Sequence, residues 1–367
     1  MENILKYSYE NFANVYNNLA DDESKLLYRA NLAWFLSGPE TFFQMVAELD
    51  RSKDFGRDEL MEYEHFKNDK SKEIVIFGAG NFGMYLFYQL ITLKYNVVAF
   101  CDSKPELHGG KKLGRPIISP DELAEKYIEA FVIISPEEEV VKNKIFRQLS
   151  DLGISKKNIC FPKAPGAILS YSKLLYFDDQ IHRPVDNEIF IDAGAFDGQT
   201  SVDFIKWCKN YQKTPYKVYA IEPTKRGAEE TQKNIENCGY NKIVEVIEGA
   251  ITEKSGFVNL DFRIPGSSKV SESGKTKVKA YTIDELLQDE RATFIKMDIE
   301  GSELAALKGA EQTIRKFSPR LAICAYHKKD DLIVLPSYIM SINAGYKFYI
   351  RKYFATKGDV VLYAVAD

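Results

Sequence analysis

The chain has 367 residues, which is more than one typical hydrophobic core accommodates, so we expect two domains and an additional segment. An apolar content of 45% and a charged content of 28% are those of an ordinary globular protein. The formal net charge of −4 gives no electrostatic reason to expect nucleic acid or an anionic membrane surface as a partner.

The five cysteines are scattered without a C-x-x-C pair, so neither a zinc site nor a disulfide framework is expected. The first residues are too polar for a signal peptide, and no apolar run approaches the length of a membrane span. We therefore expect a cytoplasmic protein with no membrane span.

Residues 1–70 are predicted to form a helical arm. Apolar residues between Leu26 and Leu36 recur at helical spacing, and Asp21 to Glu23 place acids in a first turn. Ser37-Gly38-Pro39 ends that helix, and Pro39 is suited to open another. We expect this arm to pack on its own chain or on a second subunit, as in a homodimer.

Residues 71–165 are predicted to form a Rossmann-like domain. A strand, Glu73 to Phe77, runs into a G-x-G-x-x-G turn at Gly78, Gly80 and Gly83, followed by an apolar helix. The next strand ends in Asp102, at the distance from the glycines where a ribose-binding acid is expected. These four residues are the candidate second nucleotide site.

The ligand of this domain stays open at the sequence level. A scaffold without ligand and a nucleotide or nucleotide-sugar site are equally compatible with the pattern, because a fold alone does not fix function. A nicotinamide-dependent oxidoreductase is the third reading, since no Tyr-x-x-x-Lys follows the motif.

A second series of alternating strands and helices begins after a linker at Phe161 to Gly166 and forms the domain predicted over residues 166–367. The strand Ile189 to Asp192 runs into a glycine turn and a helix, a geometry that lets backbone approach a ligand closely. The candidate ligand-binding residues of this stretch are Asp192, Gly194, Ala195, Gly198, Thr200 and Ser201.

The following strands add further candidates. The second strand ends in Glu222, which is placed to accept both ribose hydroxyls of an adenosine, and the third leads to Glu248 and Ala250, beside the expected adenine. A polar segment over residues 261–277 is predicted to be a hairpin and a candidate substrate lid.

Three carboxylates crowd the turn after the fourth strand, at Asp298, Glu300 and Glu303. The fifth strand delivers His327 to the same carboxyl edge, where open α/β sheets bind their ligands. The chain closes with two strands, expected to form an antiparallel pair.

These motifs resemble the FkbM-type family of methyltransferases. The matching stretches are 190–198, Ile221-Glu222-Pro223, 294–310 and Tyr326-His327, in the expected order over about half the chain. The resemblance implies a class I methyltransferase fold and S-adenosyl-L-methionine as cofactor, and Asp298 is a further candidate to contact that cofactor. It also implies O-methyl transfer to sugars of polysaccharides or to secondary metabolites. More loosely, the N-terminal half resembles nucleotide-binding domains found beside sugar-modifying enzymes.

Methyl transfer needs a base for the hydroxyl proton, and His327 is the first candidate because its reference pKa leaves it largely neutral at pH 7. Asp298 or Glu300 is the alternative base, or a binder of acceptor hydroxyls. Another hypothesis places magnesium or manganese between Asp298, Glu300 and Glu303, near His327. Lys328, Lys329 and Arg351 are candidates for acceptor phosphates.

The sequence thus predicts an α/β protein with two doubly wound Rossmann-like domains and an N-terminal helical arm, acting as an O-methyltransferase on a sugar, nucleotide-sugar or glycan hydroxyl. The alternatives are a nucleotide-sugar-binding or regulatory protein with an inactive methyltransferase half, and a nicotinamide-dependent sugar oxidoreductase that works through residues 71–165.

Overall fold

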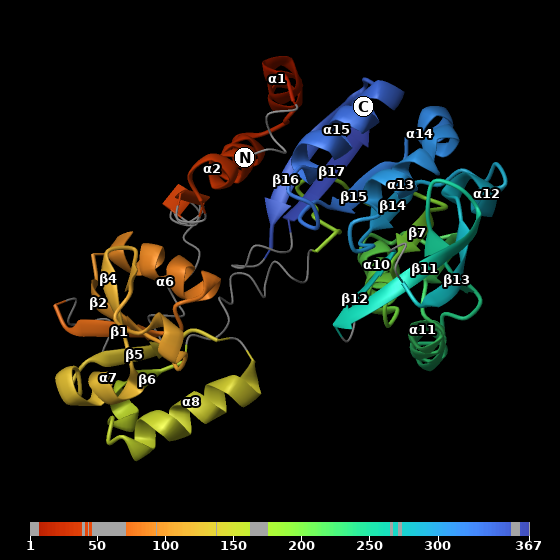
Figure 1. Cartoon of the computed structure of the whole chain (residues 1–367). Helices are drawn as coiled ribbons and strands as arrows, with labels where there is room; N and C mark the ends of the chain where they lie inside the picture. The colour runs from red at the N-terminus through yellow and green to blue at the C-terminus, as the bar shows by residue number, and fades with distance from the viewer. Residues whose placement is uncertain are drawn as a thin grey trace. The chain divides into compact units, whose positions relative to one another are not determined.

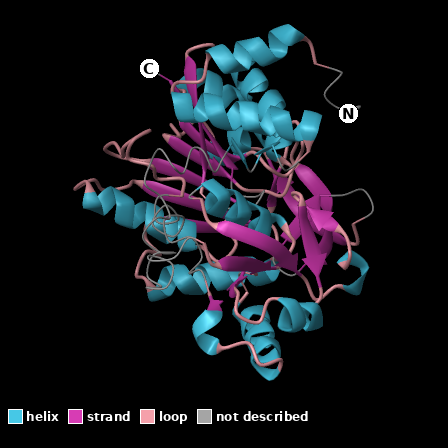
Figure 2. Cartoon of the chain, turned by 90° about the vertical axis from the view of Figure 1, so that its left-hand side faces the viewer, coloured by secondary structure: helices cyan, strands magenta, loops and turns pink. Residues whose placement is uncertain are grey.

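The computed structural model describes residues 7–38, 41–42, 44–45, 71–92, 94–136, 138–161, 175–264, 267–270, 274–353 and 360–366. The chain divides into two compact units, one made of Met1–Tyr28, Leu174–Lys352 and Asp359–Asp367 and the other of Arg29–Lys173 and Tyr353–Gly358. Both units combine helices with strands (Figures 1 and 2). The helix predicted after Pro39 and the linker predicted at Phe161 to Gly166 fall largely outside the described residues.

The unit that contains residues 71–161 is built on a sheet with the strand order β3-β4-β2-β1-β5-β6. All its pairs are parallel except β3 with β4. Its strands are β1 (Glu73–Phe77), β2 (Asn96–Cys101), β3 (Lys111–Lys112), β4 (Arg115–Ile118), β5 (Phe131–Ile134) and β6 (Ile159–Cys160). Its helices are α6 (Asn81–Thr92), α7 (Pro120–Lys126) and α8 (Glu139–Asp151), with 3-10 turns at Pro105–Leu107 and Lys156–Asn158.

Parallel strands covered on both faces need apolar side chains at every position, and β5 is buried along its whole length. The strand order reverses at β1, whose neighbours are β2 and β5. The predicted G-x-G-x-x-G turn connects β1 to α6 at this reversal, where doubly wound sheets open a crevice.

The other unit contains a seven-stranded sheet with the order β16-β17-β15-β14-β7-β8-β9. Its strands are β7 (Ile189–Ala193), β8 (Lys217–Glu222), β9 (Val244–Glu248), β14 (Phe294–Met297), β15 (Arg320–Cys324), β16 (Tyr346–Lys352) and β17 (Val360–Ala366). Its helices include α10 (Gln199–Asn210), α11 (Lys225–Asn237), α12 (Ile283–Leu287), α13 (Glu303–Lys308), α14 (Glu311–Phe317) and α15 (Asp331–Ile342). The final antiparallel pair is present, because β17 runs antiparallel to both β15 and β16.

A separate four-stranded sheet has the order β10-β13-β11-β12. It consists of β10 (Ala250–Ile251), β11 (Gly256–Ile264), β12 (Ser267–Val270) and β13 (Thr276–Tyr281), which Figure 1 draws in teal, and β10 contacts β8 of the larger sheet. The strands β11 and β12 are antiparallel neighbours, which confirms the hairpin predicted within residues 261–277.

The first helices are α1 (Tyr9–Asn17) and α2 (Asp22–Ser37). The segment between them covers the outer edge of β16, because Asn18 and Ala20 exchange backbone hydrogen bonds with Phe348. The Ser24 hydroxyl then accepts a hydrogen bond from the Ile350 amide at 2.8 Å. Residues 18–24 therefore cap an edge strand that would otherwise expose unpaired backbone groups.

Arg351 on β16 anchors this segment. Its side chain is 5% exposed and lies 2.6 Å from Asp21, 3.6 Å from Glu23 and 3.6 Å from Asp178. Burial alone would lower the pKa of Arg351, but the Asp21 and Glu23 carboxylates raise it, so the guanidinium stays charged. The prediction that Arg351 binds acceptor phosphates is wrong, because its buried guanidinium is paired with Asp21, Glu23 and Asp178.

Replacing Arg351 with methionine should destabilise the chain strongly. The change leaves buried carboxylates, such as that of the 2%-exposed Asp178, without a counter-charge, a situation that costs about 3–5 kcal/mol in proteins. Urea unfolding followed by circular dichroism measures the loss. The control is Lys316→Met, which breaks an exposed pair with Asp289 and should leave the midpoint nearly unchanged. Equal midpoints for the two variants would contradict the anchoring role.

Candidate active site

A cavity of about 840 Å³ opens at the carboxyl ends of β7, β8 and β14. Its wall combines the turns that follow these strands with the N-terminal part of α11 and with Leu260 and Val270 of the β11–β12 hairpin. The remaining lining residues include Tyr176, Gly194, Ala195, Phe196, Thr200, Glu222, Ala250, Lys296, Asp298, Glu300 and Ser302.

The turn after β7 passes extremely close to the turn after β14. Gly194 has a φ of +81°, and a Cβ atom at this position would lie 1.9 Å from the carbonyl oxygen of Asp298. Only glycine fits this conformation and this contact. The amides of Gly194 and Ala195 both donate to the Ile221 carbonyl at 3.0 Å, so the turn is closed by the neighbouring strand end.

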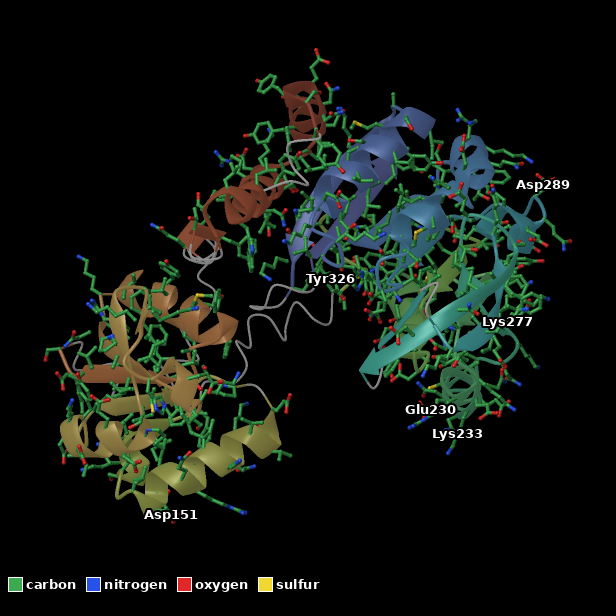
Figure 3. All side chains as sticks on the ribbon, in the orientation of Figure 1. Asp151, Glu230, Lys233, Lys277, Asp289 and Tyr326 are labelled. Atoms are coloured by element: carbon green, nitrogen blue, oxygen red, sulfur yellow. The ribbon has the colours of Figure 1, made fainter. Side chains whose placement is uncertain are left out.

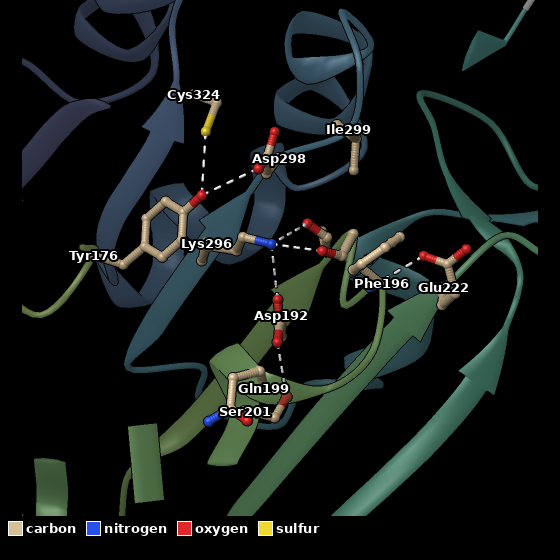
Figure 4. Close-up of polar contacts among 12 residues, drawn as sticks. Tyr176, Asp192, Phe196, Gln199, Ser201, Glu222, Lys296, Asp298, Ile299 and Cys324 are labelled. Atoms are coloured by element: carbon tan, nitrogen blue, oxygen red, sulfur yellow. Dashed lines mark hydrogen bonds and ion pairs between the residues drawn. The ribbon is translucent and has the colours of Figure 1, made fainter. Parts of the chain in front are cut away.

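Lys296 lies in the middle of the buried strand β14 and fixes the same turn from behind (Figure 4). Its ammonium group donates to Asp192 at 3.0 Å, to the Ala193 carbonyl at 3.3 Å and to the Gly194 carbonyl at 2.6 Å. These three acceptors match the three donors of an ammonium group. Burial would lower the pKa of Lys296, but the charge of Asp192 raises it.

Glu222 is held at the end of β8 by several donors (Figure 4). The carboxylate accepts hydrogen bonds from the Phe196 amide at 3.1 Å, the Thr224 amide at 3.1 Å and the Thr224 hydroxyl at 2.6 Å. Burial nevertheless raises the pKa of Glu222. A Cβ atom on Gly227 would lie 2.7 Å from Glu222, so this glycine leaves room for the carboxylate.

Two further acids line the cavity. Asp298 and Glu300 line it with side chains that are 30% and 36% exposed. The Tyr176 hydroxyl donates to Asp298 Oδ2 at 3.1 Å and lies 3.4 Å from the Cys324 sulfur (Figure 4). The cavity lining thus combines Glu222, whose carboxylate is held by backbone amides, with the acids Asp298 and Glu300.

His327 lies behind these acids and does not line the cavity. Its Nδ1 is 2.9 Å from Glu303 Oε1, and its Nε2 is 3.6 Å from Asp298 and 3.7 Å from Glu300. Burial would lower the pKa of His327, but the Glu303 carboxylate, helped by Asp298 and Glu300, raises it. The position of His327 outside the cavity lining argues against its predicted role as the base that contacts the acceptor.

Comparison with known proteins identifies this part of the chain. The family model described as methyltransferase FkbM domain matches residues 192–348, and a C2185-like N-terminal model matches residues 70–160. Residues 192–348 are an FkbM-type methyltransferase domain.

The crystal structure of methyltransferase FkbM from Methylobacillus flagellatus KT is similar, with a TM-score of 0.50 and 21% identity over 92% of this chain and 98% of that chain. A SAM-dependent methyltransferase from Aquifex aeolicus has a TM-score of 0.31 and 19% identity over 55% of this chain and 97% of that chain. No curated protein sequence matches the chain. The first likeness supports the predicted α/β class I methyltransferase fold, which is confirmed.

The structure brings together some of the residues predicted to contact the cofactor of the FkbM-type domain. Those that line the cavity are Gly194, Ala195, Thr200, Glu222, Ala250 and Asp298. Asp192 is fully buried, and its second oxygen accepts from the buried Ser201 hydroxyl at 2.8 Å, so both residues act behind the wall. Gly198 caps α10, and Glu248 is exposed at the end of β9 outside the wall.

Among the cavity residues that sequence reasoning missed are Lys296 and Tyr176. Lys296 carried a recognisable signal, because a charged residue inside a buried strand needs a partner. Tyr176 carried none, because its left-handed conformation, with a φ of +69°, depends on distant parts of the chain.

In the other unit, the residues of the predicted second nucleotide site are close together. A Cβ atom on Gly83 would lie 2.0 Å from the Gly78 carbonyl, while Gly80 has open space around it. Asp102 Oδ2 accepts from the Ala79 amide at 2.9 Å, so the acid closes the glycine turn itself. Nucleotide binding there stays a prediction.

Metal binding also stays a hypothesis. Within the described ranges, no group of three or more His, Cys, Asp or Glu side chains is arranged to hold a metal ion.

Across the same ranges, no helix is long and apolar enough to cross a membrane.

Asp331, at the start of α15, should make the stability of the FkbM-type domain depend on pH. Burial raises the pKa of this carboxyl to about 7, although the Lys328 amide donates to it at 2.7 Å. The folded chain therefore binds a proton that the unfolded chain releases near pH 4, and this stabilisation is lost as pH rises through about 7.

We compare the unfolding free energy of the native chain with that of Asp331→Asn. The difference, native minus variant, should fall by about 2 kcal/mol between pH 5 and pH 8. Urea unfolding at the two pH values measures this difference. Asp289→Asn is the control, because Lys316 lowers the pKa of the exposed Asp289, so its contribution is constant in this window. A difference that does not change with pH would contradict the assignment for Asp331.

Proposed function

We propose that the FkbM-type domain transfers the methyl group of S-adenosyl-L-methionine to a hydroxyl group of a sugar, nucleotide sugar or polysaccharide precursor. The observation that carries the proposal is the cavity itself, which is lined by the Glu222 carboxylate and by Asp298 and Glu300. Its volume of about 840 Å³ lies in the upper part of the range of about 300–1,000 Å³ common for small-molecule sites.

The Glu222 side supports an adenosine. A carboxylate at the end of the second strand of such a sheet accepts ribose hydroxyls, and Glu222 retains acceptor capacity beyond its three donors. The backbone of Gly249 to Ile251 also lines the cavity, beside the edge where an adenine ring would lie. Gly194 has no side chain, so the turn leaves space for the part of S-adenosyl-L-methionine beyond the adenosine.

The acidic side supports the chemistry. The acceptor oxygen attacks the methyl carbon in line, the carbon–sulfur bond breaks, and adenosylhomocysteine leaves as a neutral thioether. The hydroxyl proton passes to a base as the new carbon–oxygen bond forms. We assign this base to Asp298, because it lines the cavity, whereas His327 lies behind it.

Several groups around the cavity favour a polyhydroxylated acceptor. Glu300 and Ser302 offer hydrogen bonds beside Asp298, and Arg226 and Glu230 offer further polar groups from α11, on which Figure 3 marks Glu230. Phe196 is 56% exposed and lines the cavity, and an aromatic ring there suits the C–H face of a sugar ring.

Adenosylhomocysteine should raise the melting temperature of the purified chain, because a ligand at 100 times its Kd adds about 2.7 kcal/mol. Gly227→Ala should lose most of this shift, since the added Cβ displaces Glu222. Gly345→Ala is the matched control and should keep the full shift, because Gly345 lies outside the cavity lining and the added Cβ atom would meet only the Asn343 side chain at 3.1 Å. A wild-type chain with no shift would remove the proposed cofactor.

The acceptor is tested by incubating the chain and S-adenosyl-L-methionine with a panel of nucleotide sugars and simple glycosides. We expect mass spectrometry to find one class that gains a single methyl group. Asp298→Asn should lower this turnover by at least about 100-fold, in the range that general bases contribute. Methylation of none of the sugars, with cofactor binding intact, would contradict the proposed acceptor class.

A further inference from the structure

Phe196 has a backbone conformation that a bulky side chain rarely adopts. Its φ of +55° lies in the left-handed region, where a Cβ atom crowds the following carbonyl oxygen. Hydrogen bonds hold this conformation on both sides. The Phe196 amide donates to Glu222 Oε2 at 3.1 Å, and the Phe196 carbonyl accepts from the Thr231 hydroxyl at 3.1 Å. Unfavourable backbone that its surroundings hold in place is typical of functional sites.

The ring of Phe196 is not part of the hydrophobic core. It follows the buried strand β7, yet it is 56% exposed and lines the cavity. The aromatic cluster of the core is built from other rings, such as Phe190, which stacks on Phe204 with the ring centroids 4.2 Å apart. Within the described residues, no aromatic ring or cation stacks on Phe196. The ring therefore contributes to the cavity and not to the packing of the fold.

The order of the strands places Phe196 between two acids of the cavity. Strand β7 lies between β14 and β8, and Ala193 at its end is level with the residues that precede Asp298 and Glu222. The backbones of these two acids are therefore separated by two strand spacings, or about 10 Å. The turn that carries Phe196 lies between them in Figure 4.

The proposed function puts the sulfonium centre of the methyl donor at this turn. In S-adenosyl-L-methionine the sulfur is bonded to the ribose on one side and carries the methyl group that faces the acceptor. A ribose bound by Glu222 and an acceptor oxygen at Asp298 therefore leave the sulfur between the two acids. The turn offers it no amide, because those of Gly194, Ala195 and Phe196 already donate within the chain.

We propose that Phe196 presents its aromatic ring to the sulfonium of S-adenosyl-L-methionine and so binds the methyl donor in preference to the product adenosylhomocysteine. The inference rests on the proposed function, in which the ribose of the donor lies at Glu222. The face of an aromatic ring carries partial negative charge and attracts cations that have no proton to donate, such as quaternary ammonium groups. A sulfonium is a cation of this kind.

The attraction acts on the donor and not on the product. When the acceptor oxygen takes the methyl group, the electron pair of the broken carbon–sulfur bond stays on the sulfur, which becomes a neutral thioether. Adenosylhomocysteine therefore keeps the contacts of its adenosine and loses the attraction to the ring. An aromatic ring has two faces, so the face turned away from the sulfur remains available to the sugar ring of the acceptor.

The first test measures binding without an acceptor. Isothermal titration calorimetry gives the Kd of S-adenosyl-L-methionine and of adenosylhomocysteine for the native chain and for Phe196→Leu, which removes the aromatic face and keeps an apolar side chain. We expect the Kd of the donor to rise about fivefold or more and that of the product to stay within about twofold. Phe196→Tyr keeps the aromatic face and should keep the native ratio of the two constants.

Phe257→Leu is the matched control, because Phe257 is 66% exposed and lies outside the cavity lining, and it should leave both constants unchanged. An equal rise of both constants in Phe196→Leu would make Phe196 a contact of the adenosine, and no rise in either would remove it from the site. Either outcome overturns the inference and leaves the proposed function standing. A native chain that binds neither ligand would overturn both.

The second test changes the charge of the ring and keeps its shape. Ring-fluorinated phenylalanines, incorporated at position 196 with increasing numbers of fluorine atoms, withdraw electron density from the aromatic face. The Kd of the donor should rise with each added fluorine, while that of the product should not. A donor Kd that does not depend on fluorination would mean that the ring acts through its apolar surface alone, contrary to the inference.

A third variant, Phe196→Gly, separates binding from folding. Glycine adopts a positive φ without a steric clash, and the removed ring is largely exposed. The matched control is Gln212→Gly, at an exposed residue with a φ of +58° outside the cavity lining. The melting temperatures of the two ligand-free variants should agree. A clearly lower melting temperature for Phe196→Gly would make the ring part of the fold and would overturn its assignment to the sulfonium.

Discussion

The buried ion pair between Lys296 and Asp192 is the interaction on which the rest of the site depends. A charge pair this deep is favourable only when every remaining donor and acceptor is satisfied. Lys296 meets this condition with Asp192 and two turn carbonyls, and Asp192 with the Ser201 hydroxyl. The pair joins β7 to β14, so the glycine turn and the strand that delivers Asp298 share one anchor.

The parts of the structure that local sequence patterns determine were predictable. The short apolar strand before Gly194, the acid at the end of β8 and the acids after β14 are each encoded within a few residues, and the parallel order of the strands then brings them to one edge. The hairpin inside residues 261–277 was predictable for the same reason, because its polar, glycine-bearing composition differs from that of the flanking strands.

The parts that depend on distant neighbours were not predictable. Tyr176 reaches the site only because Tyr363 and His182 fix its backbone, and no pattern around residue 176 encodes those contacts. Arg351 looked like a surface cation, but residues 21–24, far away in the sequence, bury it. For His327 the reference pKa was misleading, because the charges that shift a pKa are set by packing and not by residue type.

The distribution of charge at the acidic end has a consequence for the proposed reaction. Lys296 has a buried carboxylate partner, Asp192, while Asp298 and Glu300 remain partly open to the cavity. A sulfonium donor would be repelled by an uncompensated cation at this wall and attracted by the open carboxylates. In the proposed reaction Asp298 takes the acceptor's proton as the carbon–oxygen bond forms and the sulfonium becomes a neutral thioether. Because Lys296 is neutralised by a buried carboxylate, the same wall can attract the donor through its open carboxylates and accept the proton through Asp298.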